Sequence, residues 1–313
     1  MKENTTQATG AIDEILGAVV SITAHVPEDA MSADLLGTER SGHGVFIRED
    51  GLIVTVGYIV LDAETIWVGT DENTLVPAYC IANDFDSGLA LIKPSLPVDV
   101  HTVELGSAAD LETGEPVFVV GSGGISDTIE AKVVAKREFA GRWEYLLEEA
   151  VYTAPVHPGW AGAAMLDGNG RLCGIGSLML QDPEVGNTET PVNLIIPIDT
   201  IAPVLDELCQ HGRRRTPPRP WLGMLIHEDE EQLLVAGVYR GCPADTAGLR
   251  PGDIIVKVCG RPPFSLADFL RRVWRRGPAG VSVPLTVLRD SELVEVTVET
   301  TERNAFMHKD TIN

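Results

Sequence analysis

Residues 241–255 read GCPADTAGLRPGDII, and this stretch decides the fold of the last third of the chain. Ala244–Ala247 suits a single helical turn that ends before Gly248. Pro251-Gly252-Asp253 is typical of a tight turn, and the apolar run Ile254–Val258 after it favours a strand. The stretch therefore predicts a short helix, a turn and a buried strand in close succession.

The sequence on either side extends this unit into a small α+β domain. We expect strands at Leu222–Ile226 and Leu233–Tyr239, a helix from the cap Ser265 to Arg276, and a hairpin of Val281–Arg289 with Leu293–Val298. In the helix, Leu266, Phe269, Leu270 and Val273 follow the i, i+3, i+4, i+7 spacing of an apolar face. The predicted domain covers residues 221–303, and residues 304–313 form a tail without pattern.

A change in charge separates this domain from the rest of the chain. Residues 1–212 hold 9 Lys and Arg against 33 Asp and Glu, a net charge of −24, whereas residues 213–313 hold 15 against 13, a net charge of +2. Residues 213–220 are rich in Arg and Pro and are predicted to be a linker. The overall charge of −22 argues against a whole-chain nucleic-acid binder and against adsorption to anionic membranes.

The first two hundred residues are predicted to be mainly β. Short runs rich in Val, Ile and Leu recur between turn residues, at Gly17–Ala24, Gly44–Ile47, Leu52–Val56, Thr65–Val68, Leu89–Ile92, Pro116–Val120 and Leu172–Ser177. Helical spacing appears only in Ile198–Cys209. Strands without alternating helices favour antiparallel barrels or sandwiches. With only 5% aromatic residues, their cores must be mainly aliphatic.

Neither a metal, a cofactor nor a membrane segment is indicated. The five Cys form no Cys-x-x-Cys pair, and His227 with the acidic residues 228–231 is more typical of a solvated hairpin tip than of a metal site. No run is apolar enough to span a membrane, and the N-terminus has no signal-peptide core. The sequence as written predicts a cytoplasmic protein, and a periplasmic one if an export signal has been removed.

Several motifs in order resemble the high-temperature-requirement (HtrA/Deg) serine proteases. The resemblance lies in the segments Ser41–Ile47, Asp50–Thr55, Leu89–Lys93, Pro158–Gly162, Gly168–Ile175 and Asn193–Ile198. Residues 241–260 resemble the core of a bacterial PDZ domain. The resemblance runs from about residue 12 to about residue 300 and implies a trypsin-like double β-barrel in residues 1–212, followed by one PDZ domain.

The resemblance also implies a Ser–His–Asp triad, and all three positions are changed. Where the family has Thr-Asn-x-His-Val-Val, this chain has Thr55-Val-Gly-Tyr-Ile-Val, so Tyr58 stands at the His position. Gly88 stands at the Asp position and Ala161 at the Ser position. Loss of the Ser or His alone costs on the order of 10⁶ in kcat. Because a tyrosine of ordinary pKa, about 10, is a poor base, the sequence predicts an inactive site.

Some remnants of catalysis are considered as alternatives. The backbone N–H groups of Gly159 and Ala161 stand at the oxyanion hole of the family, although Trp160 favours a repacked loop. One alternative is a substitute triad, with Asp84 or Asp86 in place of the missing Asp and His157 four residues before Ala161, but none of these residues supplies a nucleophile.

The PDZ groove is the predicted functional site that the sequence leaves least changed. The resemblance places a carboxylate-binding loop at Trp221-Leu222-Gly223-Met224, an edge strand at Met224-Leu225-Ile226 and a side-chain pocket at Phe269, Leu270 and Val273. Arg271, Arg272, Arg275 and Arg276 add a basic edge to the helix, either as a solvated face or as a docking surface for acidic segments.

These observations predict a catalytically inactive relative of the HtrA proteases that binds C-terminal or unfolded peptides, as a scaffold, a chaperone-like protein in quality control or a regulator of an active relative. Two alternatives are a serine endopeptidase with residual or rewired activity and a structural assembly protein. The resemblance implies homo-oligomers, with a trimer as the expected form, or mixed assembly with an active relative.

Overall fold

The computed structural model describes residues 12, 14–70, 74–181, 190–229 and 232–307. These residues divide into two compact units. Unit 1 comprises the described residues up to 137 and those within 149–213, and unit 2 comprises residues 138–148 and the described residues within 214–307. The tip of one long hairpin, residues 138–148, therefore clusters with the C-terminal unit.

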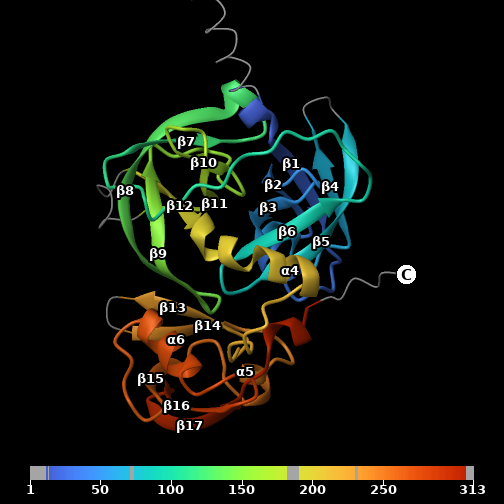
Figure 1. Cartoon of the computed structure of the whole chain (residues 1–313). Helices are drawn as coiled ribbons and strands as arrows, with labels where there is room; N and C mark the ends of the chain where they lie inside the picture. Colours follow the sequence, from blue (N-terminus) through green and yellow to red (C-terminus); the bar gives the residue numbers. More distant parts are fainter. Residues whose placement is uncertain (1–11, 13, 71–73, 182–189, 230–231, 308–313) are drawn as a thin grey trace, which may run out of the picture. The chain divides into compact units, whose positions relative to one another are not determined.

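Unit 1 contains two closed six-stranded barrels (Figure 1). The first has the order β1-β2-β3-β6-β5-β4, with β1 Val19–His25, β2 Glu39–Phe46, β3 Ile53–Val56, β4 Thr65–Gly69, β5 Leu75–Asp84 and β6 Leu89–Pro94. The second has the order β10-β11-β12-β9-β8-β7, with β7 Pro116–Val120, β8 Thr128–Gly141, β9 Tyr145–Ala154, β10 Ala164–Leu166, β11 Leu172–Leu180 and β12 Val192–Pro197. The predicted fold class, mainly β with a double barrel, is confirmed.

The helical pieces of unit 1 are short. They are α2 Ala33–Leu36, α3 Gly57–Val60, α4 Leu205–His211 and the 3₁₀ turns η1 Gly124–Asp127, η2 Ile198–Thr200 and η3 Ala202–Val204. The continuous helix expected over Ile198–Cys209 is wrong in its first half, where two 3₁₀ turns precede α4. Pro203 explains the break, because it has no N–H to continue a helical ladder.

The barrel cores are aliphatic, as the low aromatic content predicts. In the second barrel the buried cluster includes Val117, Val119, Val151, Met165 and Ile195. All four residues of β3 and all six of β12 are buried. These strands lack the alternation of a half-exposed sheet because both of their faces are covered.

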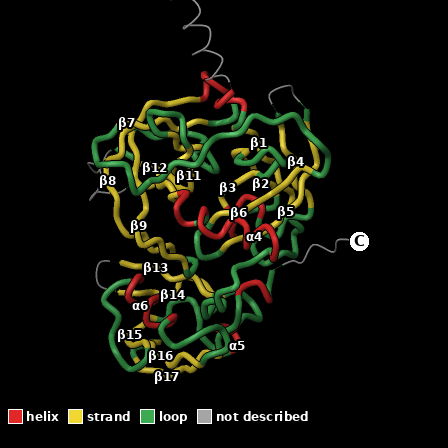
Figure 2. Tube along the Cα trace, in the orientation of Figure 1, coloured by secondary structure: helices red, strands yellow, loops and turns green. Residues whose placement is uncertain are grey.

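Unit 2 holds a five-stranded sheet in the order β13-β14-β15-β16-β17, with two helices (Figure 2). Its elements are β13 Met224–Asp229, β14 Gln232–Val238, α5 Pro243–Thr246, β15 Ile254–Val258, α6 Leu266–Trp274, β16 Ser282–Arg289, β17 Glu292–Glu299 and η4 Arg303–Ala305. The turn Asp290-Ser291 has φ of +50° and +68°, as a two-residue primed hairpin turn requires. The predicted hairpin is confirmed.

Helix α6 begins where the sequence predicts and ends two residues early. The Ser265 hydroxyl accepts the Asp268 N–H at 3.0 Å, which satisfies one of the N–H groups without a helical partner. Phe269, Leu270 and Val273 are fully buried in the core of this unit. The apolar stripe is thus the core face of α6. No helix among the described residues is long and apolar enough to cross a membrane.

Candidate functional site

Tyr58, at the predicted His position, lies in α3 directly after β3. Its hydroxyl donates a 2.7 Å hydrogen bond to the backbone oxygen of Ser177 in β11. Burial raises the pKa of Tyr58 far above its ordinary value, and a hydrogen bond with the Trp160 side chain opposes this only in part. The phenol therefore stays protonated and acts as a structural donor, which does not suit a general base.

A buried arginine fixes the backbone around Tyr58. The Arg40 guanidinium donates 2.8 Å hydrogen bonds to the carbonyls of Tyr58 and Leu61 and to the Ser32 hydroxyl. Burial lowers the pKa of Arg40, but a guanidinium remains charged in proteins. These bonds hold α3 in one position and leave the Tyr58 side chain little freedom to withdraw.

Gly88, at the predicted Asp position, sits in a tight turn between β5 and β6 with φ of +78°. Its N–H donates to the Asp84 carbonyl and its carbonyl accepts from the Gly57 N–H, both at 2.8 Å. The Asp84 carboxylate accepts the Ser87 N–H at 3.2 Å within the same turn. A side chain at position 88 would be strained, and Asp84 is used to hold the turn.

Ala161, at the predicted Ser position, lies in a loop tied to β2. The Ala161 carbonyl accepts the His43 N–H at 2.8 Å, and Gly162 has φ of +82°. The Gly159 N–H, one half of the predicted oxyanion hole, donates to the Nδ1 atom of His157 at 3.1 Å. A donor that is paired within its own loop is not available to a bound carbonyl or anion. The contact therefore favours the prediction that this loop has repacked and no longer forms an oxyanion hole.

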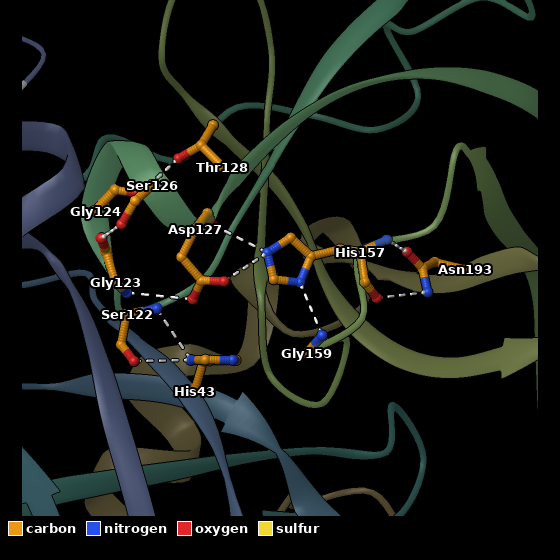
Figure 3. Close-up of polar contacts among 10 residues, drawn as sticks. All are labelled: His43, Ser122, Gly123, Gly124, Ser126, Asp127, Thr128, His157, Gly159 and Asn193. Atoms are coloured by element: carbon orange, nitrogen blue, oxygen red, sulfur yellow. Dashed lines mark hydrogen bonds and ion pairs between the residues drawn. The ribbon is translucent and has the colours of Figure 1, made fainter.

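A polar cluster that the sequence did not indicate lies beside this loop (Figure 3). The His157 side chain is 1% exposed, and its Nε2 lies 3.0 Å from the Asp127 carbonyl and 3.3 Å from the Asp127 carboxylate. Because Nδ1 accepts the Gly159 N–H, Nε2 carries the proton and donates to Asp127. His157 is therefore held as one tautomer by its neighbours.

His43 and Ser122 form the second half of the cluster. The Ser122 N–H donates to the His43 Nδ1 at 3.1 Å, and the Ser122 hydroxyl lies 3.1 Å from the same atom. Burial lowers the pKa of His43, although the Asp127 carboxylate opposes this shift. A neutral imidazole within reach of a serine hydroxyl has the composition of a nucleophile–base pair. The sequence signal for it was weak, since His43 and Ser122 are far apart in the chain.

The predicted carboxylate-binding loop of unit 2 binds a carboxylate in this structure, and that carboxylate belongs to the chain itself. The Leu222 N–H donates to Oε2 of Glu144 at 2.8 Å. The N–H groups of Gly223 and Met224 donate to Oε1 at 2.7 Å and 3.1 Å. Gly223 has φ of +79°, the backbone conformation that lets successive N–H groups converge here.

The Glu144 carboxyl is completely buried by these contacts. Burial raises its pKa to about 7, although the three backbone N–H groups and the charge of Arg303 lower it. Glu144 also has φ of +61°, an unusual backbone conformation for a residue with a side chain. The sequence around Glu144 gives no sign of this role, because its partners lie 78–80 residues further along the chain.

The same hairpin tip is hydrogen-bonded to the predicted edge strand and shares a hydrophobic cluster with the predicted pocket residues. The Ile226 N–H of β13 donates to the Arg142 carbonyl at 2.8 Å. Leu146 is buried in one hydrophobic cluster with Phe269, Leu270 and Val273 of α6. The structure thus brings the predicted groove residues together around residues 138–148.

Two arginines of the predicted basic edge, Arg271 and Arg272, form ion pairs, whereas Arg275 and Arg276 are exposed and lie beyond the end of α6. Arg271 forms ion pairs with Glu138 and Glu148, at the two ends of the hairpin tip, and Arg272 pairs with Asp268 on its own helix at 2.8 Å. His227 lies in β13, and the acidic residues 230 and 231 next to it are outside the described residues. Within the described ranges, no group of three or more His, Cys, Asp or Glu is placed to hold a metal ion.

Comparisons with known proteins match both units. Residues 42–175 match the family described as trypsin-like peptidase domain, and residues 220–300 match the PDZ domain family. A probable periplasmic serine endoprotease DegP-like from Hahella chejuensis is 29% identical over 274 residues, covering 83% of this chain and 57% of the relative. The chloroplastic Protease Do-like 1 of Arabidopsis thaliana is 29% identical over 313 residues, covering 90% of this chain and 69% of the relative.

Solved structures share the fold. The HtrA-type protease AlgW with a tripeptide has a TM-score of 0.55 and 21% identity, with 94% of this chain and 96% of that chain covered. The serine endoprotease from Yersinia pestis has a TM-score of 0.53 and 22% identity, with 93% and 97% covered. The chain spans little more than half the length of several curated bacterial relatives that it matches.

Proposed function

Since the chain is an HtrA/DegP homologue that carries a trypsin-like peptidase domain followed by a PDZ domain, we propose that it binds peptides without cleaving them. Peptide recognition is assigned to the PDZ domain, at Trp221–Ile226 and the α6 face. The observation that carries the proposal is the carboxylate held by three N–H groups of the 222–224 loop. A loop that binds one carboxylate this way has the donors needed for a peptide C-terminus.

The loss of catalysis is supported by the surroundings of the three changed positions. Tyr58 is a half-buried donor to a carbonyl, Gly88 is held at positive φ, and Ala161 has no hydroxyl. Restoring Ser at position 161 alone would leave the site without a base, and a site that lacks the triad retains about 10³–10⁴-fold catalysis over water at most. Inactivity therefore does not depend on Ala161 alone.

A labelled-casein assay with the native chain and with Ala161→Ser tests this part of the proposal. We expect neither protein to hydrolyse casein above the rate in buffer, because neither has a base at position 58. Casein hydrolysis by Ala161→Ser that is lost in the double variant Ala161→Ser/His157→Ala would refute it, since His157 would then serve as the base.

A second candidate function, hydrolysis at a relocated nucleophile, is favoured by the contact between the Ser122 hydroxyl and His43. It predicts covalent labelling of Ser122 by a fluorophosphonate probe and loss of labelling in Ser122→Ala and His43→Ala. We rank it second because the backbone N–H of Ser122 donates to the same nitrogen, which leaves that nitrogen less available to take a proton.

Domain limits, assembly and compartment complete the proposal. We assign the peptidase-like domain to residues 1–212, the linker to 213–220 and the PDZ domain to 221–303, with residues 304–313 as a tail. A trimer, or mixed assembly with an active relative, is the proposed quaternary state, and analytical ultracentrifugation at micromolar concentration tests it. Relatives named as periplasmic endoproteases favour a periplasmic location over the cytoplasmic one.

A further inference from the structure

We propose that the PDZ groove is closed by the chain's own hairpin tip, residues 138–148, and that peptides bind only by displacing it. Glu144 takes the place of a peptide's C-terminal carboxylate, and Leu146 takes the place of its last side chain. This inference rests on the proposed function, because a competitor matters only if the groove binds peptides.

The first argument is that the tip uses the donors that a peptide would need. Both carboxylate oxygens of Glu144 are bound, and all three N–H groups of residues 222–224 donate to them. A second carboxylate would meet a negative charge and no remaining donor in the loop. The two carboxylates therefore compete for one site.

The second argument is that the tip also occupies the strand edge. β13 pairs with β14 on one side, and among the described strands it has no partner on the other side. On that strand the Ile226 N–H donates to the Arg142 carbonyl. PDZ ligands bind by adding a strand through such main-chain bonds, so an incoming peptide needs the group that Arg142 already engages.

The third argument concerns the pocket and the ligand class. Leu146 is 5% exposed and shares its cluster with Phe269, Leu270 and Val273. A peptide ending in Leu with a free carboxylate would supply in one residue both groups that the tip supplies through Glu144 and Leu146. We therefore infer that the displacing ligands are free C-termini ending in a Leu-sized aliphatic residue.

The fourth argument is that the tip is held at its two ends by surface charges. Arg271 pairs with Glu138 and with Glu148, and the Arg271 side chain is about one-third exposed. Exposed ion pairs contribute little each, so this clamp can be opened without unfolding the domain. Displacement of the tip requires movement of residues 138–148, which comprise the end of β8, the turn 142–144 and the start of β9.

Fluorescence anisotropy on the full chain tests the inference. The probe is a fluorescein-labelled hexapeptide ending in Tyr-Leu with a free carboxylate, and its C-terminal amide is the negative control. We compare the native chain with Glu144→Ala, which removes the internal carboxylate, and with Glu130→Ala, a matched control at an exposed glutamate of β8.

We expect Glu144→Ala to bind the free-acid peptide at least about tenfold more tightly than the native chain and Glu130→Ala. The apparent Kd equals the intrinsic Kd divided by the fraction of molecules whose groove is open. If the tip is docked in about nine-tenths of the molecules, this fraction is about one-tenth and the apparent Kd is about tenfold higher. Arg271→Ala keeps the inference testable if Glu144→Ala does not fold, because it loosens only the clamp. We expect it to tighten binding about two- to fivefold.

The outcomes separate this inference from the proposed function. Equal affinity in the native chain, Glu144→Ala and Arg271→Ala would overturn self-occupation and leave peptide binding intact. A folded Glu144→Ala that binds neither the Leu-terminated peptide nor its amide would overturn the proposed function itself. Tighter binding of the amide as well as the acid would show that the carboxylate loop is not the shared site, which also contradicts the inference.

Discussion

Replacing Tyr58 by Phe removes one hydroxyl and tests whether this residue has become part of the structure. The hydroxyl donates to the carbonyl of Ser177, a residue that is 3% exposed. Ser177 is the extra residue of a β-bulge, since Gly176 pairs with Ile195 and Leu178 with Leu194. The strand ladder therefore gives its carbonyl no opposite residue, and Tyr58 satisfies it instead.

The expected cost follows from that geometry. A buried carbonyl left without its donor costs about 1–3 kcal/mol. In a unit of this size each 1 kcal/mol lowers Tm by about 2–4 °C, so Tyr58→Phe should lower the Tm of unit 1 by several degrees. The loss of the Trp160 contact acts in the same direction.

Differential scanning calorimetry of Tyr58→Phe beside Tyr79→Phe measures this difference. Tyr79 is 44% exposed on β5, so its substitution should change the free energy of unfolding by no more than about 0.5 kcal/mol. If the two variants unfold at the same temperature, the hydroxyl of Tyr58 contributes nothing to stability and our reading of this position is wrong.

Two further predictions concern the PDZ domain. Glu144 has a pKa of about 7 when bound to the 222–224 loop, against an ordinary value of 4.5. Binding of the Glu144 carboxyl to this loop is therefore most stable below about pH 4.5 and weakens by roughly 3 kcal/mol in total as the pH rises through 7. Peptide affinity of the native chain should thus increase between pH 5 and pH 8, whereas an equal increase in Glu144→Ala would show that Glu144 is not its cause. Gly223→Ala would place a Cβ on a backbone with φ of +79°, 2.5 Å from the Cβ of Cys242. We therefore expect Gly223→Ala to abolish peptide binding when it is added to Glu144→Ala. Retained binding would contradict the assignment of residues 221–224 as the carboxylate-binding loop.

The elements that the sequence predicted well are those set by local patterns. The cap of α6 at Ser265 and the hairpin around Asp290-Ser291 depend on a few neighbouring residues, and both are present. The double barrel followed from motifs spread along the chain, and its two closed sheets are present as well.

What the sequence missed depends on distant contacts. Strand β8 runs for 14 residues but contains Lys132, Lys136 and Glu138, which obscure any apolar pattern. Glu144 lies in GRWEYLLEE, a stretch typical of an ordinary exposed hairpin tip. Its role depends on donors that are nearly eighty residues away, and no local periodicity carries that information. The same limit hid the contact between His43 and Ser122, which are separated by 79 positions.

The two predicted ligand sites of this chain, the altered triad and the PDZ groove, each contain one of its own side chains, Tyr58 and Glu144, and these two residues are held differently. Tyr58 is neutral and lies within α3, its hydroxyl donates to the buried Ser177 carbonyl, and its backbone carbonyl is bound by the buried Arg40. Glu144 is an ionisable group on a hairpin tip whose ends are held by exposed ion pairs. A residue held in the first way is permanent, whereas one held in the second way can be exchanged for a ligand at modest cost. This difference fits our two proposals, a triad site that is permanently lost and a PDZ groove that a ligand can open.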